Sequence, residues 1–329
     1  MRAGQMKAVA DLGTRVGDVA HRAGEPSAVL ADLRRIAAFD AVMLSAWDPL
    51  TRAQRPLVST GYGASLLRFL NTSYLSCTSY RTAQELCRPM RMQDFGPSFY
   101  RTPVYRDFLR AAGFREGVTL VLRSPGPRGQ LTGLLTMSFT ETRAADEDVR
   151  EALELAAPVL AQLVDVCLPS VWMAGMLGGG SQAVLVDGRG ASVPLNDAGL
   201  ELSVQLRRVT ADFLVGDQSS LRGFAARSAD ARWERAQMVR LAPDPRTDGP
   251  RALVMVAHTA LPHELTEREL DVLTLVSRGL SNREAGAVLG TSPRTVSTHV
   301  EHLLLKTGRA NRAALASYAV DNGVLRLDL

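Results

Sequence analysis

Lysine is almost absent from this chain of 329 residues. Of its 38 basic residues only Lys7 and Lys306 are lysines, and no histidine lies between His21 and His258. P-loop ATPases, pyridoxal-phosphate enzymes and phosphorylated receiver domains all need a lysine. No domain of these classes is therefore expected in the stretch between Lys7 and Lys306. The lack of histidine removes histidine-ligated haem and most histidine-based metal sites from most of the same region.

Cysteine is also scarce. Cys77, Cys87 and Cys167 are odd in number and follow no spacing pattern, which is typical of a reducing cytoplasm rather than of a disulfide framework. The first two lie in one irregular segment, where a redox switch is conceivable, although two ordinary small residues are the simpler interpretation. We expect no metal and no cofactor.

A long apolar run suited to a membrane span is missing as well. Residues 155–180 carry only Asp165 as a charge, but Pro158, Pro169 and a closing glycine run favour a buried helix followed by a linker. The N-terminus carries Asp11 where an export signal needs an apolar run. We therefore predict a cytoplasmic protein with no membrane partner.

Composition suggests two or three domains. With 46% apolar residues, a chain of this length has more apolar side chains than one small hydrophobic core can hold. The net charge of +4 is mild, so the chain is not expected to be a strongly basic protein that coats nucleic acid along its whole length. No set of residues along the chain has the pattern of a catalytic site, and we predict that the protein is not an enzyme.

The richest pattern spans residues 265–320. Thr266 is placed to cap a helix, and Glu269, three residues later, is its capping-box partner. Apolar residues then recur at helical spacing until Gly279, which ends the helix.

Two more helices follow at once. Ser281 is an N-cap for residues 282–289, and Gly290 ends that helix. Ser292, with Pro293 at the first helical position, begins the next. Its expected buried stripe is formed by Val296, Val300, Leu303 and Leu304. A fourth helix is predicted over residues 312–322.

Two helices joined by a tight glycine turn are the skeleton of a helix-turn-helix, whose second helix lies in the DNA major groove. At this point the residues resemble the LuxR-type DNA-binding domain, also found in GerE-like and NarL-like regulators. The resemblance rests on Leu265-Thr266-Glu267-Arg268-Glu269, Gly279-Leu280-Ser281-Asn282, Thr295-Val296, His299-Val300, Lys306 and Arg312. It covers about 60 residues, under a fifth of the chain.

One position departs from the family pattern. Ala285-Gly286 replaces the usual Ile-Ala of the second helix. Because glycine inside a helix costs about 1 kcal/mol relative to alanine, we expect this module to be less stable than its relatives. Many such proteins are response regulators, but without a receiver lysine this one is not expected to respond to aspartyl phosphorylation.

The resemblance implies the residues that touch DNA. Base edges are expected to meet Ser297, Thr298 and Glu301, and phosphates to meet Arg294, Thr295, His299 and Lys306; the predicted DNA-binding set also includes Ser292 and Arg309. Residues 262–329 carry eight basic and eight acidic residues, so phosphate attraction per subunit is modest. Binding to double-stranded DNA as a homodimer is therefore expected, with the fourth helix (Leu315, Tyr318, Ala319) and the helices at 6–19 and 153–166 as dimer contacts. The alternative is that these apolar faces are buried within one subunit, which is the expected outcome for Leu315.

The N-terminal part reads as a sheet enclosed by helices. Strands are expected at 41–47, 55–61, 118–123 and 131–140, and helices at 6–19, 64–70, 104–112 and 144–167, with residues 74–101 irregular. This pattern resembles a GAF-type sensor domain, but the lysine-containing signature of cyclic-nucleotide GAF domains is absent. The acyl-homoserine-lactone pocket of quorum-sensing LuxR proteins is not recognisable either.

If this domain has a ligand pocket, the sequence allows two classes of ligand, anionic and apolar. An apolar molecule would lie against Phe95, Phe99 and Tyr105, whereas an anionic effector would need arginine, for which the candidates are Arg81, Arg88, Arg91 and Arg101. A purely structural domain with no ligand is the third possibility. The effector, if one exists, is unspecified by the sequence.

Residues 183–195 read as strand, Asp-x-x-Gly turn and strand, and resemble the opening of a PAS domain, with late strands at 233–241 and 251–259. The overall prediction is an α+β multidomain protein: a GAF-like α/β sensor domain (1–168), a small PAS-like α+β domain (169–260) and an all-α four-helix LuxR-type domain (261–329). The predicted function is a bacterial DNA-binding transcriptional regulator controlled through the GAF-like domain by a small molecule or a protein. The alternative is an interaction scaffold whose helix-turn-helix binds protein.

Overall fold

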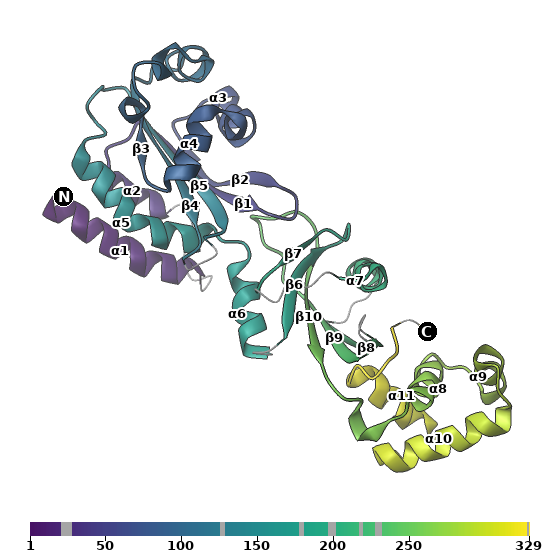
Figure 1. Cartoon of the computed structure of the whole chain (residues 1–329). Helices are drawn as coiled ribbons and strands as arrows, with labels where there is room; N and C mark the ends of the chain where they lie inside the picture. The colour runs from purple at the N-terminus through teal and green to yellow at the C-terminus, as the bar shows by residue number, and fades with distance from the viewer. Residues whose placement is uncertain are drawn as a thin grey trace. The chain divides into compact units, whose positions relative to one another are not determined.

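A computed structural model describes residues 1–20, 28–125, 129–177, 181–196, 202–216, 220–227, 232–327 and 329. The chain divides into two compact units. The N-terminal unit comprises Met1–Leu168 and Asp244–Asp248, and the C-terminal unit comprises Pro169–Pro243 and Gly249–Leu329. Figure 1 shows the elements of each unit.

The N-terminal unit is built on a five-stranded antiparallel sheet of order β2-β1-β5-β4-β3. Its strands are β1 (Ala41–Asp48), β2 (Ala53–Thr60), β3 (Met90–Arg91), β4 (Glu116–Arg123) and β5 (Leu131–Phe139). The four strands expected from the sequence are confirmed within two residues, and β3 was not expected. The turn residues 126–128 between β4 and β5 lie outside the described part.

Helices cover both faces of this sheet (Figure 1). The opening helix α1 (Ala3–Ala20), α2 (Val29–Ile36) and the closing helix α5 (Glu147–Val164) lie on one face, with α3 (Ala64–Asn71) and α4 (Thr78–Leu86) on the other. The side chain of Asp146 caps α5 by accepting from the Val149 amide at 2.9 Å. The predicted sheet enclosed by an opening and a closing helix is therefore confirmed.

The segment expected to be irregular contains more helix than the sequence indicates. Besides α4 it holds the short turns η2 (Ser73–Ser76), η3 (Met92–Phe95) and η4 (Phe99–Arg101), followed by the π-helical turn η5 (Val104–Leu109). Only Ser79, Tyr80 and Ala83 of α4 are buried, so this helix lacks the apolar stripe that makes a helix visible in sequence.

A short return of the chain belongs to the N-terminal unit. Arg246 donates to the carbonyl of Leu163, in the last turn of α5, at 2.7 Å and pairs with Asp244 at 2.6 Å. Its charge also faces Asp165, whose pKa is raised by burial. Residues 244–248 thus complete the end of α5 although they lie about 80 residues away in sequence.

The C-terminal unit begins with α6 (Leu168–Leu177) and a second antiparallel sheet of order β7-β6-β10-β9-β8. Its strands are β6 (Gln182–Asp187), β7 (Ser192–Pro194), β8 (Leu221–Arg227), β9 (Trp233–Arg240) and β10 (Arg251–His258). Numbered within its own sheet, this strand order repeats that of the first sheet. The four predicted strands are confirmed.

Two elements of this unit were missed. Helix α7 (Val204–Gly216) covers one face of the second sheet through Leu206, Phe213 and Leu214, and β8 adds the edge strand. The predicted linker 178–180 lies outside the described residues.

The chain ends in four helices: α8 (Glu267–Ser277), α9 (Asn282–Leu289), α10 (Pro293–Thr307) and α11 (Arg312–Asp321), preceded by the turn η6 (Pro262–Glu264). Their apolar residues form one core that includes Leu270, Leu273, Val296 and Leu315. The all-α four-helix prediction is confirmed, and every predicted helix end lies within about one residue.

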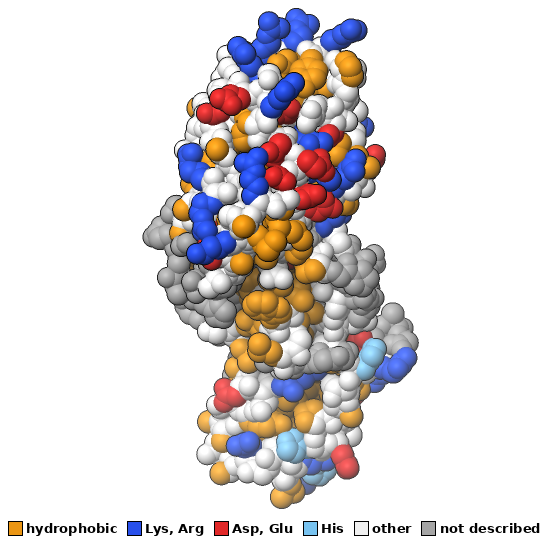
Figure 2. Space-filling model, turned by 90° about the vertical axis from the view of Figure 1, so that its left-hand side faces the viewer, with side chains coloured by type: hydrophobic (Ala, Val, Ile, Leu, Met, Phe, Trp, Pro, Cys, Tyr) orange, Lys and Arg blue, Asp and Glu red, His pale blue; other side chains and the backbone are white. Residues whose placement is uncertain are grey.

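Helix α6 has an exposed apolar surface. It carries no charged residue, and the exposed fractions of Val171, Trp172 and Met176 are 39%, 52% and 83%. Figure 2 shows hydrophobic side chains gathered across the middle of the drawn face. Within the described residues, no single helix is long and apolar enough to cross a membrane; only the pair Glu147–Val164 and Leu168–Met176, bent by 71°, passes by length and composition together.

Candidate functional sites

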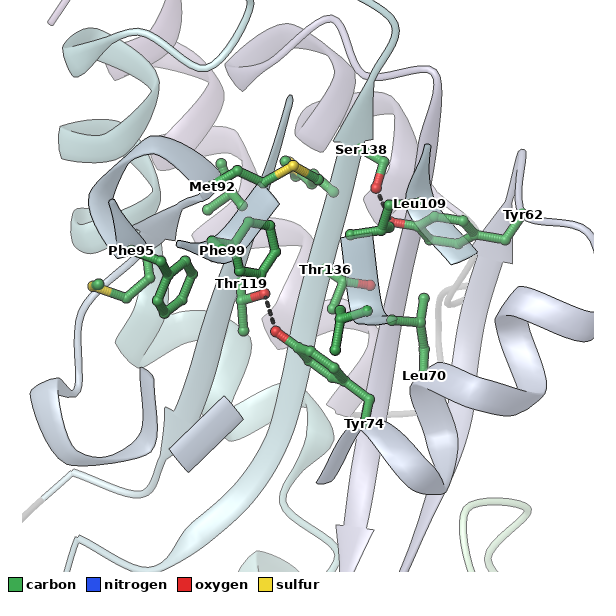
Figure 3. A pocket seen from close by; sticks show the side chains of 15 residues that line it. Tyr62, Leu70, Tyr74, Met92, Phe95, Phe99, Leu109, Thr119, Thr136 and Ser138 are labelled. Atoms are coloured by element: carbon green, nitrogen blue, oxygen red, sulfur yellow. Dashed lines mark hydrogen bonds between the residues drawn. The ribbon is translucent and has the colours of Figure 1, made fainter. Parts of the chain in front are cut away.

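A small cavity lies between the first sheet and the segments that join its strands. Its volume is about 30 Å³, room for about one or two water molecules. Figure 3 shows side chains from β4, β5, the turn η3 and the helix α3 converging on it. The lining includes Tyr62, Leu70, Tyr74, Met92, Phe95, Phe99, Thr119, Thr136 and Ser138.

Hydroxyl groups supply the polarity of this cavity. The phenol of Tyr74 lies 2.8 Å from Oγ1 of Thr119, and that of Tyr62 lies 2.9 Å from Oγ of Ser138 (Figure 3). Burial raises the pKa of Tyr62 to about 12, against a smaller lowering by the hydroxyls of Ser138 and Thr136. Both phenols therefore stay neutral at physiological pH and can donate or accept hydrogen bonds.

The aromatic residues expected at a ligand pocket divide into two groups. Phe95 and Phe99 line the cavity and stack with ring centroids 5.2 Å apart. Tyr105 lies behind them, 6.0 Å from the Phe99 ring and 4.9 Å from that of Tyr100, and lines a separate surface hollow with Arg110. Sequence reasoning found the aromatic wall but missed the hydroxyls.

The arginines expected to hold an anionic effector lie outside this cavity. The Arg91 guanidinium pairs with Asp94 at 2.9 Å and with Glu147 at 3.0 Å, so its charge is already neutralised. Arg88 is exposed after α4. The prediction of an arginine-lined pocket is therefore wrong for this cavity. Burial also raises the pKa of the Cys77 thiol, which disfavours the reactive thiolate.

The C-terminal helices are fixed by side-chain caps. Thr266 and Glu269 form the predicted capping box at α8, since Oγ1 of Thr266 accepts from the Glu269 amide and Oε2 of Glu269 accepts from the Thr266 amide at 2.8 Å. Ser281 and Glu284 form a second box at α9. Ser292 caps α10 by accepting from the Thr295 amide at 3.1 Å.

The turn between α9 and α10 is tight. Gly290 ends α9 with φ of 63°, a conformation that favours glycine. One turn earlier, a Cβ on the buried Gly286 would lie 2.8 Å from the carbonyl oxygen of Thr291. The Thr291 amide donates back to the Gly286 carbonyl at 2.9 Å. Glycine at 286 is thus explained by the close approach of this turn.

Helix α10 turns one face inward and leaves the other exposed. Val296, Val300 and Leu303 are buried as predicted, whereas Leu304 is half-buried and Thr307 is buried in addition. The predicted contact residues lie on the remaining surface. Ser292, Arg294, Thr295, Thr298 and Glu301 are exposed, and Ser297 and His299 are half-buried.

The basic residues at the end of α10 and beyond are engaged within the domain. The Lys306 ammonium lies 2.7 Å from Oε2 of Glu269 and 3.0 Å from the Glu264 carbonyl. The Arg309 guanidinium lies over the Tyr318 ring at 4.8 Å, and Arg312 donates to Oδ1 of Asn282 at 2.9 Å. Of the predicted phosphate contacts, Lys306 is therefore also bound within the domain.

Residues 263–319 match the family model described as bacterial regulatory proteins, luxR family. The C-terminal domain is a LuxR-type domain.

Curated relatives share this domain. The probable transcriptional regulator ycf29 of Pyropia yezoensis is 42% identical over 65 residues, which is 20% of this chain and 29% of that protein. The uncharacterised transcriptional regulatory protein YhcZ of Bacillus subtilis is 48% identical over 58 residues, 18% of this chain and 27% of that protein. The match thus spans less than a third of either relative.

Among solved structures, the phycoerythrobilin-bound GAF domain of a cyanobacterial phytochrome is similar to this chain. The identity is 17%, the TM-score is 0.35, and the match covers 50% of this chain and 95% of that domain. A TM-score this low supports no conclusion about the function of the first sheet.

Within the LuxR-type domain, the predicted dimer face on α11 is not available. Leu315, Tyr318 and Ala319 are buried inside the subunit, where α11 packs on α8. Burial within the subunit, the expected alternative for Leu315, is therefore confirmed, and the dimer-face prediction is wrong for Tyr318 and Ala319, because the apolar face of α11 is needed for the core of the domain. On the surface of α11, Val320 is an exposed large apolar residue, with an exposed fraction of 48%.

Proposed function

We propose that this protein is a sequence-specific, DNA-binding transcriptional regulator that works in the cytoplasm. The observation that carries the proposal is the LuxR-type domain, with the N-terminal half of α10 exposed directly after its Ser292 cap. An exposed helix of this kind is the element that a helix-turn-helix inserts into the major groove. The proposed domains of this regulator are the GAF-like domain (1–168), the PAS-like domain (169–260) and the LuxR-type domain (261–329).

The contact residues follow from the exposed side of α10. Ser297, Thr298 and Glu301 face base edges, and Ser297 donates to Glu301 at 3.5 Å, which orients the carboxylate. Phosphates are held by Ser292, Arg294, Thr295 and His299. Lys306 and Arg309 add positive potential, but each is also bound inside the domain.

Salt dependence tests this proposal. Affinity of the full chain for a genomic DNA pool is expected to fall steeply with salt, because each neutralised phosphate releases a counterion. Arg294→Ala should reduce the slope of log affinity against log salt by about 1. Arg101→Ala removes another exposed arginine, from η4, and serves as the charge-matched control.

An interaction scaffold is the second candidate. The balance of eight basic and eight acidic residues in 262–329, together with the internal engagement of Lys306, Arg309 and Arg312, favours it. A scaffold would show no salt-dependent DNA affinity, and Arg294→Ala would behave like Arg101→Ala. That result would replace the DNA-binding proposal with the scaffold.

We also propose that the protein acts as a homodimer. A near-neutral domain gains affinity by reading two half-sites, about one DNA turn apart, through a twofold axis. Because the apolar face of α11 is buried, we propose that the dimer contact lies on α1 and α5, where Met6 and Leu155 are 59% and 57% exposed, and on α6. Sedimentation equilibrium at micromolar concentration tests this, and a strict monomer with and without DNA contradicts it.

The GAF-like domain is proposed to control DNA binding through a small neutral molecule in the cavity of Figure 3. The lining supports this class of ligand, because it combines apolar and aromatic side chains with hydroxyls and has no charged side chain. At about 30 Å³ the cavity must widen to admit one. A protein effector acting on the same domain remains the other form of this control.

Two comparisons test whether the GAF-like domain regulates DNA binding. The operator affinity of the full chain is compared with that of residues 261–329, and then with that of Phe99→Ala, which enlarges the cavity. Arg88→Ala, on the exposed surface of the same unit, is the matched control. Equal affinity in all four proteins would mean that the N-terminal domain does not regulate DNA binding.

A further inference from the structure

Residues 324–327 follow α11 and run along the edge strand β8. The amide of Ala225 donates to the carbonyl of Leu325 at 2.6 Å, and the amide of Leu327 donates to the carbonyl of Ala225 at 3.0 Å. Together they form a parallel bridge between Ala225 and Arg326. Because β8 is the edge strand of the second sheet, the tail extends that sheet by β-augmentation within one chain.

Two glycines allow this approach. A Cβ on Gly223 would lie 2.8 Å from Cα of Gly323, and a Cβ on Gly323 would lie 2.6 Å from Cα of Gly223. The two backbones therefore touch with no side chain between them. Gly323 also has φ of 63°, whereas Gly223 lies within an ordinary strand.

Arg326 joins the tail to the LuxR-type domain and to the sheet. Its guanidinium lies 2.6 Å from Asp271 and 3.0 Å from Glu267, both on α8, and 5.9 Å from the Trp233 ring on β9. Its amide donates to Oγ1 of the buried Thr274 at 2.8 Å. Residues 324–327, here called the tail latch, thus contact both the sheet and α8.

Other contacts around the tail latch are both polar and apolar: Ala225 and the partly buried Trp233 pack in one apolar cluster with Val324 and Leu325. Arg227 of β8 pairs with Glu267 at 2.7 Å, and Arg235 of β9 donates to the carbonyl of Asn322 at 2.7 Å. A cavity of about 140 Å³ lies beside them, lined by Arg235, Tyr318 and Val324 among others. The junction between the second sheet and α8 thus combines charged contacts with a shared apolar cluster.

We propose that the tail latch fixes the LuxR-type domain to the second sheet and thereby sets which spacing of DNA half-sites a dimer accepts. The latch leaves the predicted base-reading residues Thr298 and Glu301 exposed, so it orients the recognition helix without covering it. A helix held to its sheet presents itself at one angle and position, whereas an unlatched domain can adapt to several. This inference rests on the proposed DNA-binding function.

Gly223→Ala is the variant that opens the latch. Its local backbone suits alanine, and the new Cβ meets only Gly323 across the junction closer than 3.7 Å. Gly216→Ala at the end of α7 is the matched control, because nothing lies within 4 Å of its new Cβ. Arg326→Gln, which removes the ion pairs while keeping the backbone bonds, opens the same junction by an independent route.

The first measurement is hydrogen exchange of the full chain without DNA. Gly223→Ala and Arg326→Gln are expected to speed exchange of the Ala225 and Leu327 amides by ~10-fold or more while β10 and α10 stay protected. Gly216→Ala should leave both amides unchanged. Unaltered exchange at Ala225 and Leu327 in both latch variants would overturn the latch itself, and loss of protection in β10 would disqualify Gly223→Ala and leave the decision to Arg326→Gln.

The second measurement is affinity for inverted half-sites whose spacing is varied by single base pairs around about one DNA turn. Wild type and Gly216→Ala are expected to favour one spacing over the worst by a factor in the range of ~5–150 that is typical of coupled sites. In the latch variants this ratio should fall toward 1. An unchanged ratio despite faster exchange overturns the spacing role while DNA binding stands, whereas absence of binding in all four proteins refutes the proposed function instead.

Discussion

Substituting Gly286 by alanine is expected to weaken the LuxR-type domain, against the usual trend for helices. In an open helix the change gains about 1 kcal/mol, because alanine loses less backbone freedom than glycine. Here the new Cβ would lie 2.8 Å from the Thr291 carbonyl oxygen and 3.5 Å from the Pro293 nitrogen. Both neighbours are backbone atoms, which cannot rotate away as a flexible side chain would.

The magnitude follows from the two opposing terms. A comfortable C···O contact is about 3.3–3.6 Å, so the turn between α9 and α10 must retreat by roughly 0.5–0.8 Å. Overfilling a packed site costs ~1–3 kcal/mol. Subtracting the propensity gain of ~1 kcal/mol leaves a net destabilisation between ~0 and ~2 kcal/mol. The upper value corresponds to roughly 30-fold faster opening.

Native-state hydrogen exchange of the α9 and α10 amides in the full chain measures this effect. Gly175→Ala on α6 is the control, because nothing lies within 4 Å of its new Cβ and only the propensity gain acts. Operator affinity should fall along with protection in Gly286→Ala, since the start of the recognition helix moves. If Gly286→Ala slowed exchange in its helix as Gly175→Ala does in α6, close packing of the turn would not be the reason for this glycine.

In the recognition helix, Glu301→Ala should relax the preference at one base pair by ~1–3 kcal/mol, because a carboxylate accepts well only from cytosine N4; an unchanged consensus after selection from random DNA contradicts this orientation. Lys306→Ala should lower the melting temperature of the LuxR-type domain by leaving Glu269 without its ammonium partner, and a loss of DNA affinity at unchanged stability would instead assign that ammonium to phosphate. Burial opposes ionisation of Glu269, but hydrogen bonds from Lys306 and Thr266 outweigh it and lower its pKa. Its stabilisation is therefore complete above the ordinary glutamate value of ~4.3 and is lost as pH falls through the lower folded value. Melting curves between pH 3 and pH 6 should show this acid loss in wild type and a flatter profile in Glu269→Gln.

The LuxR-type domain was predictable almost to the residue because its signals are local. The N-caps of α8, α9 and α10 are Thr266, Ser281 and Ser292, each directly before the first turn of its helix. Gly290 ends α9 in the same local way. By contrast, the partner of Lys306 lies 37 residues away, and its contact with Glu269 could not be predicted from the residues around the lysine. Pairing between distant helices leaves no mark in the neighbouring sequence.

The same reason explains what was missed in the two sheets. Thr119 and Thr136 look like ordinary strand formers, and they become part of one cavity only because β4 and β5 pair in the register that sets them opposite each other. Strand β8, rich in small residues, is a strand because β9 and the tail pair with it. The aromatic wall of Phe95 and Phe99 was predictable from composition, whereas Arg91 was misassigned because Glu147 lies far along the chain.

Residues 244–248 make the two units inseparable by a single cut. A fragment ending at Leu168 would leave the Leu163 carbonyl without the Arg246 guanidinium and the partly buried Asp165 without its nearby positive charge. Exchanging the first unit for a different one would likewise leave Arg246 in the hairpin between β9 and β10 with no matching helix end. The first unit must therefore be expressed and redesigned together with the hairpin between β9 and β10, and any chimaera has to include that hairpin.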